Sequence, residues 1–233
     1  MSGHSHWATI KHGKEANDKK RSKIFSKMSL LITIAAKQGG DPDMNPALRL
    51  AIDKAKKENM PKDNIERAIK RGTGELEGET LEEFTFEAYG PEKSAIIITG
   101  ITTNRNRALN EIKIILSNNN AKLANEGSVK WQFEEKGVII IKPEDKEKAE
   151  LKIIESGAED FSEQGEFIEI YTVPNDLEIV KNNIEKDFKI ENTNLGWVAK
   201  EEIQVQDIEK INKLLSALDD NDDVQEVYTN IKL

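Results

Sequence analysis

Basic side chains are concentrated near the start of this chain. Seven lie between residues 11 and 27, where only Glu15 and Asp18 oppose them. They are Lys11, Lys14, Lys19, Lys20, Arg21, Lys23 and Lys27. On a helix of about 3.6 residues per turn, Lys19, Lys23 and Lys27 form a ridge along one side. Such a row binds the phosphates of a nucleic-acid backbone with release of counterions, so the ridge predicts contact with a polyanion.

Trp7 lies close to the first of these charges. A flat apolar ring in a basic segment is suited to stacking on an unpaired base. It is equally suited to covering the apolar side of a helical unit as a hydrophobic lid, and both interpretations stay open.

A second cationic segment, Thr103-Asn104-Arg105-Asn106-Arg107, stands where a predicted strand ends and a predicted helix begins. Free backbone N–H groups at a helix N-terminus favour anions, and Arg105 and Arg107 would hold phosphate in planar forks. The competing interpretation is a capped helix with solvated arginines. The third predicted helix of the chain is also basic, but Asp63 and Glu66 on it oppose a duplex backbone. Its other polar side chains are Lys62, Asn64, Arg67, Lys70 and Arg71.

Residue types that support catalysis or metal binding are scarce. The chain has no cysteine, which excludes disulfides, thiolate catalysis and cysteine-ligated zinc. His4, His6 and His12 all fall in a segment without periodicity, where a general base lacks an orienting partner. A free amine at Ser2 together with His4 would chelate Cu(II) or Ni(II), an arrangement that needs only a chance histidine. We therefore expect no catalytic residue, no metal site and no cofactor.

Residues 219–223 resemble the start of a calcium-binding loop. However, Val224 stands where that loop needs glycine, and Asn230 stands where it needs a bidentate glutamate. A polar turn after a helix is the better interpretation.

Charge is divided unevenly along the 233 residues, whose net charge is −9. Residues 1–74 contain 16 Lys and Arg and 8 Asp and Glu, a net charge of +8, whereas residues 75–233 contain 18 and 35, a net charge of −17. A basic head on an acidic body indicates that the head meets a polyanion, the alternative being two solvated surfaces. Because no apolar run resembles a signal peptide or a membrane span, we expect a soluble protein of the cytoplasm.

Apolar periodicity predicts a unit of three helices in the basic head. The first begins near Glu15 and ends at Gly39-Gly40, the second begins at Asn45-Pro46, and the third begins at Pro61. Residues 73–83 are rich in Gly and Glu and are predicted to form a linker.

Beyond the linker, alternating apolar residues predict strands at 84–88, 94–101 and 129–133, with a helix over 104–118. In the third of these strands Val129, Trp131 and Phe133 share one face. The order predicted over residues 136–203 is β-α-β-β-α-β, the ferredoxin-like arrangement.

A helix over 207–218 and a strand over 224–231 remain, while the middle segment lacks one of each. We therefore predict an α+β multi-domain chain, with an N-terminal three-helix domain and two ferredoxin-like α/β domains, the third inserted into the second. The expected boundaries are residues 1–80, residues 81–135 together with 204–233, and residues 136–203.

Short motifs distributed over essentially the whole chain resemble the YebC family. They are Gly3-His4-Ser5, Trp7, Ile10-Lys11-His12, Lys14, Ala35-Ala36-Lys37, Gly39-Gly40, Asn59-Met60-Pro61-Lys62-Asp63-Asn64-Ile65, Asn104-Arg105-Asn106-Arg107, Gly127-Ser128-Val129, Gly157-Ala158-Glu159-Asp160, Asp222-Asp223-Val224-Gln225 and Val227-Tyr228. The resemblance implies three domains, one helical and two α/β. It also implies a role in gene expression, since members are described as DNA-binding transcriptional regulators and as ribosome-associated translation activators in bacteria and mitochondria. It implies no enzyme activity and no cofactor.

The chain departs from the family pattern at three positions. His6 stands where Lys is expected, Thr103 where Asp is usual, and Ala108 where Thr is usual. The first change removes a fixed charge, and the second alters a helix-capping side chain beside Arg105 and Arg107.

These observations predict a non-enzymatic, nucleic-acid-binding regulator of gene expression, most simply a translation activator that binds ribosomal RNA on the ribosome. The alternative is a DNA-binding transcriptional regulator, and a more distant one is a scaffold whose acidic domains dock another protein. Phosphate contacts make affinity fall steeply with salt, whereas a mostly apolar protein interface does not.

Overall fold

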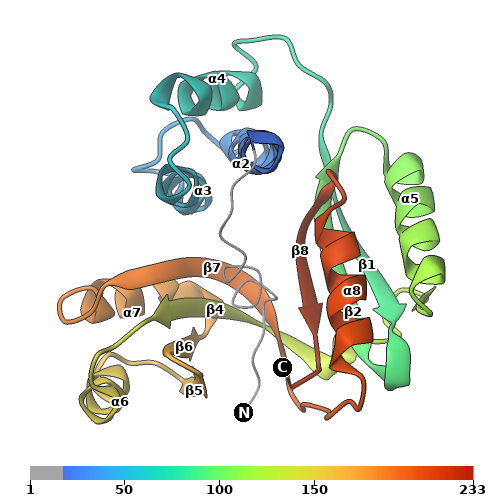
Figure 1. Ribbon diagram of the computed structural model, residues 1–233. Coiled ribbons are helices and arrows are strands. Elements are labelled where there is room, and N and C mark those ends of the chain that lie inside the picture. The colour runs from blue at the N-terminus through green and yellow to red at the C-terminus, as the bar shows by residue number, and fades with distance from the viewer. Residues whose placement is uncertain (1–17, 233) are drawn as a thin grey trace.

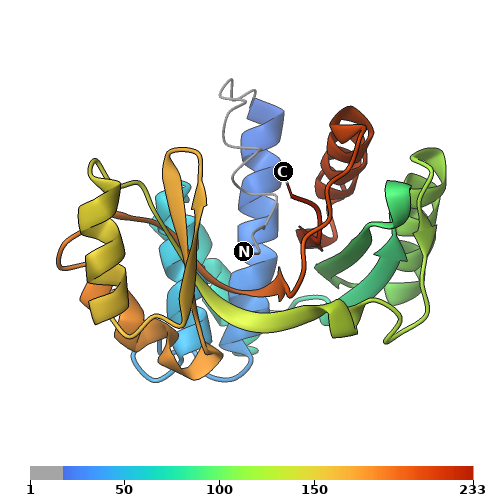
Figure 2. The same cartoon turned by 90° about the horizontal axis from the view of Figure 1, so that it is seen from below.

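A computed structural model describes residues 18–232 of the chain, with side chains from residue 21 onward. It contains a helical domain and two α/β domains, which confirms the predicted fold class (Figure 1). Figure 2 shows the two α/β domains side by side, with β4 running from one to the other and α2 over their junction. Within residues 18–232, no helix has the length and apolar character that a membrane crossing requires.

The helical domain forms because each helix is limited by local signals. From residue 18 onward its helices are α2 (Asp18–Ala36), α3 (Pro46–Lys57) and α4 (Lys62–Gly72). The side chain of Asn45 caps α3 by accepting the backbone N–H of Leu48 at 3.1 Å, and Pro46 follows in the first turn. Aliphatic and small side chains, among them Ile32 and Ala68, fill the space between the helices.

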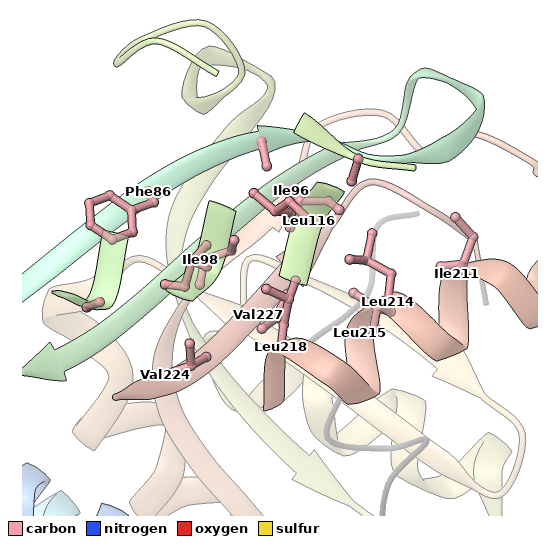
Figure 3. Close-up of a cluster of buried hydrophobic side chains, with 14 of the residues drawn as sticks. Phe86, Ile96, Ile98, Leu116, Ile211, Leu214, Leu215, Leu218, Val224 and Val227 are labelled. Atoms are coloured by element: carbon pink, nitrogen blue, oxygen red, sulfur yellow. The ribbon is translucent and has the colours of Figure 1, made fainter. Parts of the chain in front are cut away.

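The first α/β domain is built from two separate parts of the chain. Its elements are β1 (Glu82–Tyr89), β2 (Ala95–Thr102), α5 (Arg105–Asn118), β3 (Lys122–Leu123), α8 (Ile208–Asp219) and β8 (Val224–Thr229), with a short 3-10 helix η1 (Pro91–Lys93) between β1 and β2. The strands form an antiparallel sheet in the order β3-β1-β2-β8. Both helices pack on one face of it, where Ile98, Leu116, Leu214 and Val227 meet in one core (Figure 3). The C-terminal helix and strand therefore complete a domain that begins at residue 82.

The inserted domain has the β-α-β-β-α-β order predicted from the sequence. Its elements are β4 (Phe133–Ile141), α6 (Lys146–Glu155), β5 (Asp160–Gln164), β6 (Phe167–Thr172), a 3-10 helix η3 (Pro174–Asp176), α7 (Leu177–Ile184) and β7 (Ile190–Ala199). The sheet order β5-β6-β4-β7 is that of a ferredoxin-like domain. Ile139, Ile153 and Ile170 lie in the core between the sheet and its helices. On the opposite face, the buried carboxylate of Glu169 accepts the hydroxyl of Tyr171 at 3.0 Å.

The predicted strand through Val129, Trp131 and Phe133 is wrong in its first half. Lys130–Gln132 form a 3-10 helix, η2, and β4 begins only at Phe133. The carboxylate of Glu87 on β1 accepts the N–H groups of Val129 and Lys130, so these groups do not join a strand ladder. As a result Val129 and Phe133 are buried, whereas Trp131 is turned outward and 68% exposed.

Candidate nucleic-acid interface

A hollow between α2 and α4 collects three arginines. Arg21 of α2 lines it together with Arg67 and Arg71 of α4, and its volume is about 650 Å³. The rest of the lining consists of Ser22, Phe25, Ser26, Ser29, Leu30, Asn64 and Ala68. We call this hollow the arginine groove. Of the three helices, α4 lies farthest from the inserted domain (Figure 1).

Helix periodicity places these side chains on the two facing sides. Asn64, Arg67 and Arg71 recur at intervals of three and four residues and so share one face of α4, and the serines of α2 recur in the same way. Gly72 permits close packing at the end of α4, because a Cβ there would lie 2.3 Å from the carbonyl oxygen of Thr33. The groove therefore forms between the facing sides of α2 and α4, which pack closely at Gly72.

The arginines of the groove are open to a ligand. All three are exposed, and among the side chains that the structure describes none forms an ion pair with them. The guanidinium of Arg21 lies 5.4 Å from the centre of the Phe25 ring, which orients it by a cation–π contact. Guanidinium groups and hydroxyl donors lining one groove are suited to phosphate oxygens.

The predicted lysine ridge, by contrast, is occupied by residues 219–223, which we call the acidic loop. The ammonium of Lys27 donates to the carbonyl oxygen of Asp219 at 2.6 Å, and that of Lys23 donates to the carbonyl oxygen of Asp220. Two carboxylates of the loop also lie within 3.7 Å of Lys23. The expectation of an open ridge is therefore wrong for Lys23 and Lys27, because both hold the helical domain against the first α/β domain.

Lys27 interacts electrostatically with the acidic loop. Its side chain is buried between α2 and the loop. Burial lowers the pKa of Lys27 below its ordinary value, while the carboxylate of Asp219 opposes that shift. Separation of the loop from α2 would return Lys27 to solvent, where it could meet another anion.

The two arginines at the start of α5 also have partners within the protein. Arg107 donates through one nitrogen to both carboxylate oxygens of Asp223, at 2.7 and 3.0 Å, and this hydrogen-bonded ion pair raises the pKa of Arg107. The guanidinium of Arg105 lies 5.3 Å from the centre of the Phe86 ring and donates to a backbone carbonyl of β1 at 3.4 Å. Asn104 caps α5 by accepting the N–H of Arg107 at 3.0 Å. The helix is thus capped, as in the competing interpretation, and both arginines have partners within the protein while they remain exposed to solvent.

Further lysines of the helical domain also bind the α/β domains. Lys37 donates to the carbonyl oxygen of Leu81 at 2.6 Å, and Lys54 forms a partly buried ion pair with Glu226. Lys57 donates at 3.2 Å to backbone carbonyls of β7. Several lysines of the basic head therefore bind the α/β domains, whereas the cations of the arginine groove have no ion-pair partner among the described side chains.

Five other candidate residues have no described side chain. Lys19 and Lys20 belong to α2, but only their backbone is described. Trp7, Lys11 and Lys14 lie outside the described residues.

Arg67 and Arg71 were not among the candidate site residues expected from the sequence. Their spacing of four residues, with Asn64 three positions earlier, is the signal that places them together on one helix face. That they meet Arg21 follows only from the packing of α4 on α2.

Two family models match the chain and together cover most of it. The model of the TACO1/YebC protein N-terminal domain matches residues 5–75, and that of the TACO1/YebC second and third domain matches residues 81–231. The second match spans both α/β domains, including the C-terminal helix and strand.

Full-length relatives agree with these models. A protein of Persephonella marina, named a probable transcriptional regulatory protein, is 50% identical over 100% of this chain and 96% of its own length. One of Halothermothrix orenii with the same name is 46% identical over the same shares. The crystal structure of a conserved hypothetical protein from Aquifex aeolicus superposes with a TM-score of 0.89 at 43% identity, covering 98% of this chain and 97% of that one. This chain therefore belongs to the TACO1/YebC family.

Proposed function

We propose that this protein is a cytoplasmic, nucleic-acid-binding regulator that acts in translation by binding ribosomal RNA through its helical domain. The arginine groove carries the proposal, because it presents three guanidinium groups on one side of a basic domain, and no described side chain forms an ion pair with them. Such groups bind phosphates without regard to base sequence.

RNA is favoured over duplex DNA by the form of this surface. A reader of duplex DNA commonly places a helix in the major groove and pairs two subunits over spaced half-sites. Here Arg67 and Arg71 face α2 across the groove rather than standing out on a free helix, and α4 also carries Asp63 and Glu66. A groove with hydroxyl and guanidinium donors suits one irregular strand better than a duplex.

DNA binding is the second candidate because the relatives in Persephonella and Halothermothrix are named probable transcriptional regulatory proteins. The same arginines would bind DNA phosphates at low salt, since that contribution to affinity does not depend on sequence. The two candidates therefore differ in the partner recovered from cells.

Replacing Arg67 and Arg71 by glutamine is expected to weaken binding to single-stranded RNA and to reduce the slope of log affinity against log salt by about one unit, since each phosphate contact contributes about 0.7. Crosslinking in cells, followed by sequencing of both nucleic acids, is expected to recover ribosomal RNA with the wild-type protein and less of it with the variant.

The matched control is the pair Lys113→Gln and Lys213→Gln, which removes two exposed charges from α5 and α8. This control should keep the wild-type slope, because neither lysine lines the groove. If the wild type, the groove variant and the control have the same slope of log affinity against log salt, the groove does not contact the RNA. Recovery of discrete promoter sites, without enrichment of ribosomal RNA, would show that the protein acts in transcription rather than in translation.

Neutralising the acidic loop is expected to strengthen RNA binding. Changing Asp219, Asp220 and Asp222 to asparagine removes the carboxylates that lie near Lys23 and Lys27. The two lysines would keep their bonds to the carbonyl oxygens of Asp219 and Asp220 but lose the competing carboxylates. Phosphates would then bind these lysines more readily, with an affinity increase of about tenfold and a steeper salt dependence of about one unit.

Three exposed acids away from the loop, Glu144, Glu201 and Glu209, provide the control for total charge. Their glutamine variant raises the net charge equally but leaves the contacts of Lys23 and Lys27 intact. If both triple variants strengthen binding to the same degree, the acidic loop has no specific role.

A further inference from the structure

An aromatic pair on the first α/β domain lies outside the arginine groove. Trp131 is 68% exposed and Tyr89 is 37% exposed. The indole N–H of Trp131 donates to the carbonyl oxygen of Ser128 at 3.0 Å, and the hydroxyl of Tyr89 donates to the same oxygen at 3.3 Å. The two rings therefore flank one carbonyl group, each with its polar atom satisfied.

A buried carboxylate, that of Glu87, holds the loop of residues 127–130 that carries this carbonyl group. Glu87 accepts the N–H groups of Gly127 and Val129 at 2.6 Å each and that of Lys130 at 2.9 Å. Burial alone would raise the pKa of Glu87, but these three donors together hold it below its ordinary value. The orientation of Trp131 is thus set before any partner binds, which reduces the entropy lost on binding.

Three lysines belong to the segments that carry the two rings or pair with them. Lys122 stands directly opposite Tyr89 in the β1–β3 pair, so the two side chains share a face of the sheet. The ammonium of Lys130 lies 4.7 Å from the centre of the Trp197 ring, and Lys93 belongs to the turn after Tyr89.

These lysines are open to an anion. All three are exposed, and among the described side chains none forms an ion pair with Lys93, Lys122 or Lys130. Glu126 is the single acidic residue within 121–130. Rings that offer a π-face beside cations match unpaired bases joined by phosphates. Lysine is depleted in protein–protein interfaces, so the three lysines favour a nucleic acid over a protein partner.

We propose that Tyr89 and Trp131 form a second contact surface for RNA, on which unpaired bases stack while Lys122 and Lys130 bind the adjoining phosphates. This proposal rests on the proposed function, but it concerns a different domain and a different kind of contact. The arginine groove binds the backbone, and this surface distinguishes unpaired from paired bases, because paired bases in a helix have no free face to offer.

The first test compares binding of a short oligoadenylate by the wild type and by Trp131→Ala, Trp131→Phe and Lys122→Gln/Lys130→Gln. We expect Trp131→Ala to weaken binding about fivefold to a hundredfold without changing the salt slope, since stacking is not ionic. Trp131→Phe should retain most of the affinity, and the double lysine variant should reduce the slope by about one unit. Binding of an RNA duplex should be unaffected by Trp131→Ala.

The second test observes the ring itself. In a Trp7→Phe/Trp197→Phe background, Trp131 is the only tryptophan of the chain, and oligoadenylate is expected to quench its fluorescence in a saturable manner. Unchanged fluorescence on saturation, or an unchanged affinity of Trp131→Ala for the single strand, would overturn this proposal. If the wild type binds neither RNA, the proposed function itself has failed, so the two failures are distinguishable.

Discussion

A chain that ends before residue 207 is expected to lose its cooperative fold and to aggregate. Seven side chains of the core of the first α/β domain come from this last segment, and all are buried. They are Ile211, Leu214, Leu215, Leu218, Val224, Val227 and Ile231. Burial of each contributes about 1.5–3 kcal/mol, so their joint loss of about 10–20 kcal/mol is as large as the total stability of an ordinary protein, about 5–15 kcal/mol. The truncation also opens the edge of β2, an aliphatic strand that would pair with other chains.

Thermal unfolding followed by circular dichroism, together with the soluble fraction after expression, measures this loss. A graded version compares two residues of α8 in the full chain. Leu214→Ala should cost about 2–5 kcal/mol, because its side chain is fully buried, whereas Ile208→Ala should be nearly neutral, because Ile208 lies outside the core. A soluble truncated chain that melts cooperatively near the full-length protein would show that α8 and β8 are dispensable.

Replacing Glu169 by glutamine is expected to stabilise the protein above pH 7 by about 3 kcal/mol, since each unit by which burial raises the pKa of Glu169 is equivalent to about 1.4 kcal/mol. The side chain is buried, and one of its carboxylate oxygens has no hydrogen-bond partner. Burial raises the pKa of Glu169 to about 7, although the hydroxyl of Tyr171 opposes the shift. The folded state therefore holds a proton that the unfolded chain releases near pH 4.5.

The contribution of this group to stability is fully present below about pH 4.5 and is lost as the pH rises through 7, the reverse of the behaviour of a salt-bridged carboxylate. Urea unfolding at pH 5 and pH 8 measures it. The wild type should lose stability between these values, and Glu169→Gln should lose less, whereas the exposed control Glu144→Gln should follow the wild type. Identical pH dependence in Glu169→Gln and the wild type would mean that the carboxyl is charged inside the fold.

The parts of the fold that follow from the sequence are those fixed by neighbouring residues. Asn45 followed by Pro46 marks the start of α3 because the capping side chain accepts an N–H group only three residues away. The β-α-β-β-α-β order of the inserted domain follows in the same manner from the alternation of apolar patterns along one continuous segment.

The parts that do not follow depend on residues far apart in the chain. Helix geometry correctly places Lys23 and Lys27 on one side of α2, but it contains no information about the acidic loop, which is 192 positions from Lys27. Alternation around Trp131 is overridden by Glu87, whose carboxylate takes the N–H groups that a strand would use. In both places the structure is determined by a buried or half-buried charged group that binds residues far away in the sequence. A local pattern of residue types contains no information about such long-range contacts.

The return of the chain to its first sheet has a consequence for the order of assembly during synthesis. The strands β1 and β2 leave the ribosome early, but β8, which pairs with β2, is made only after the whole inserted domain. At about 5–20 residues per second, the aliphatic edge of β2 waits several seconds for its partner. The inserted domain can therefore finish folding before the first α/β domain is complete. A ribosome that stops before residue 224 releases a chain in which the apolar edge of β2 is unpaired.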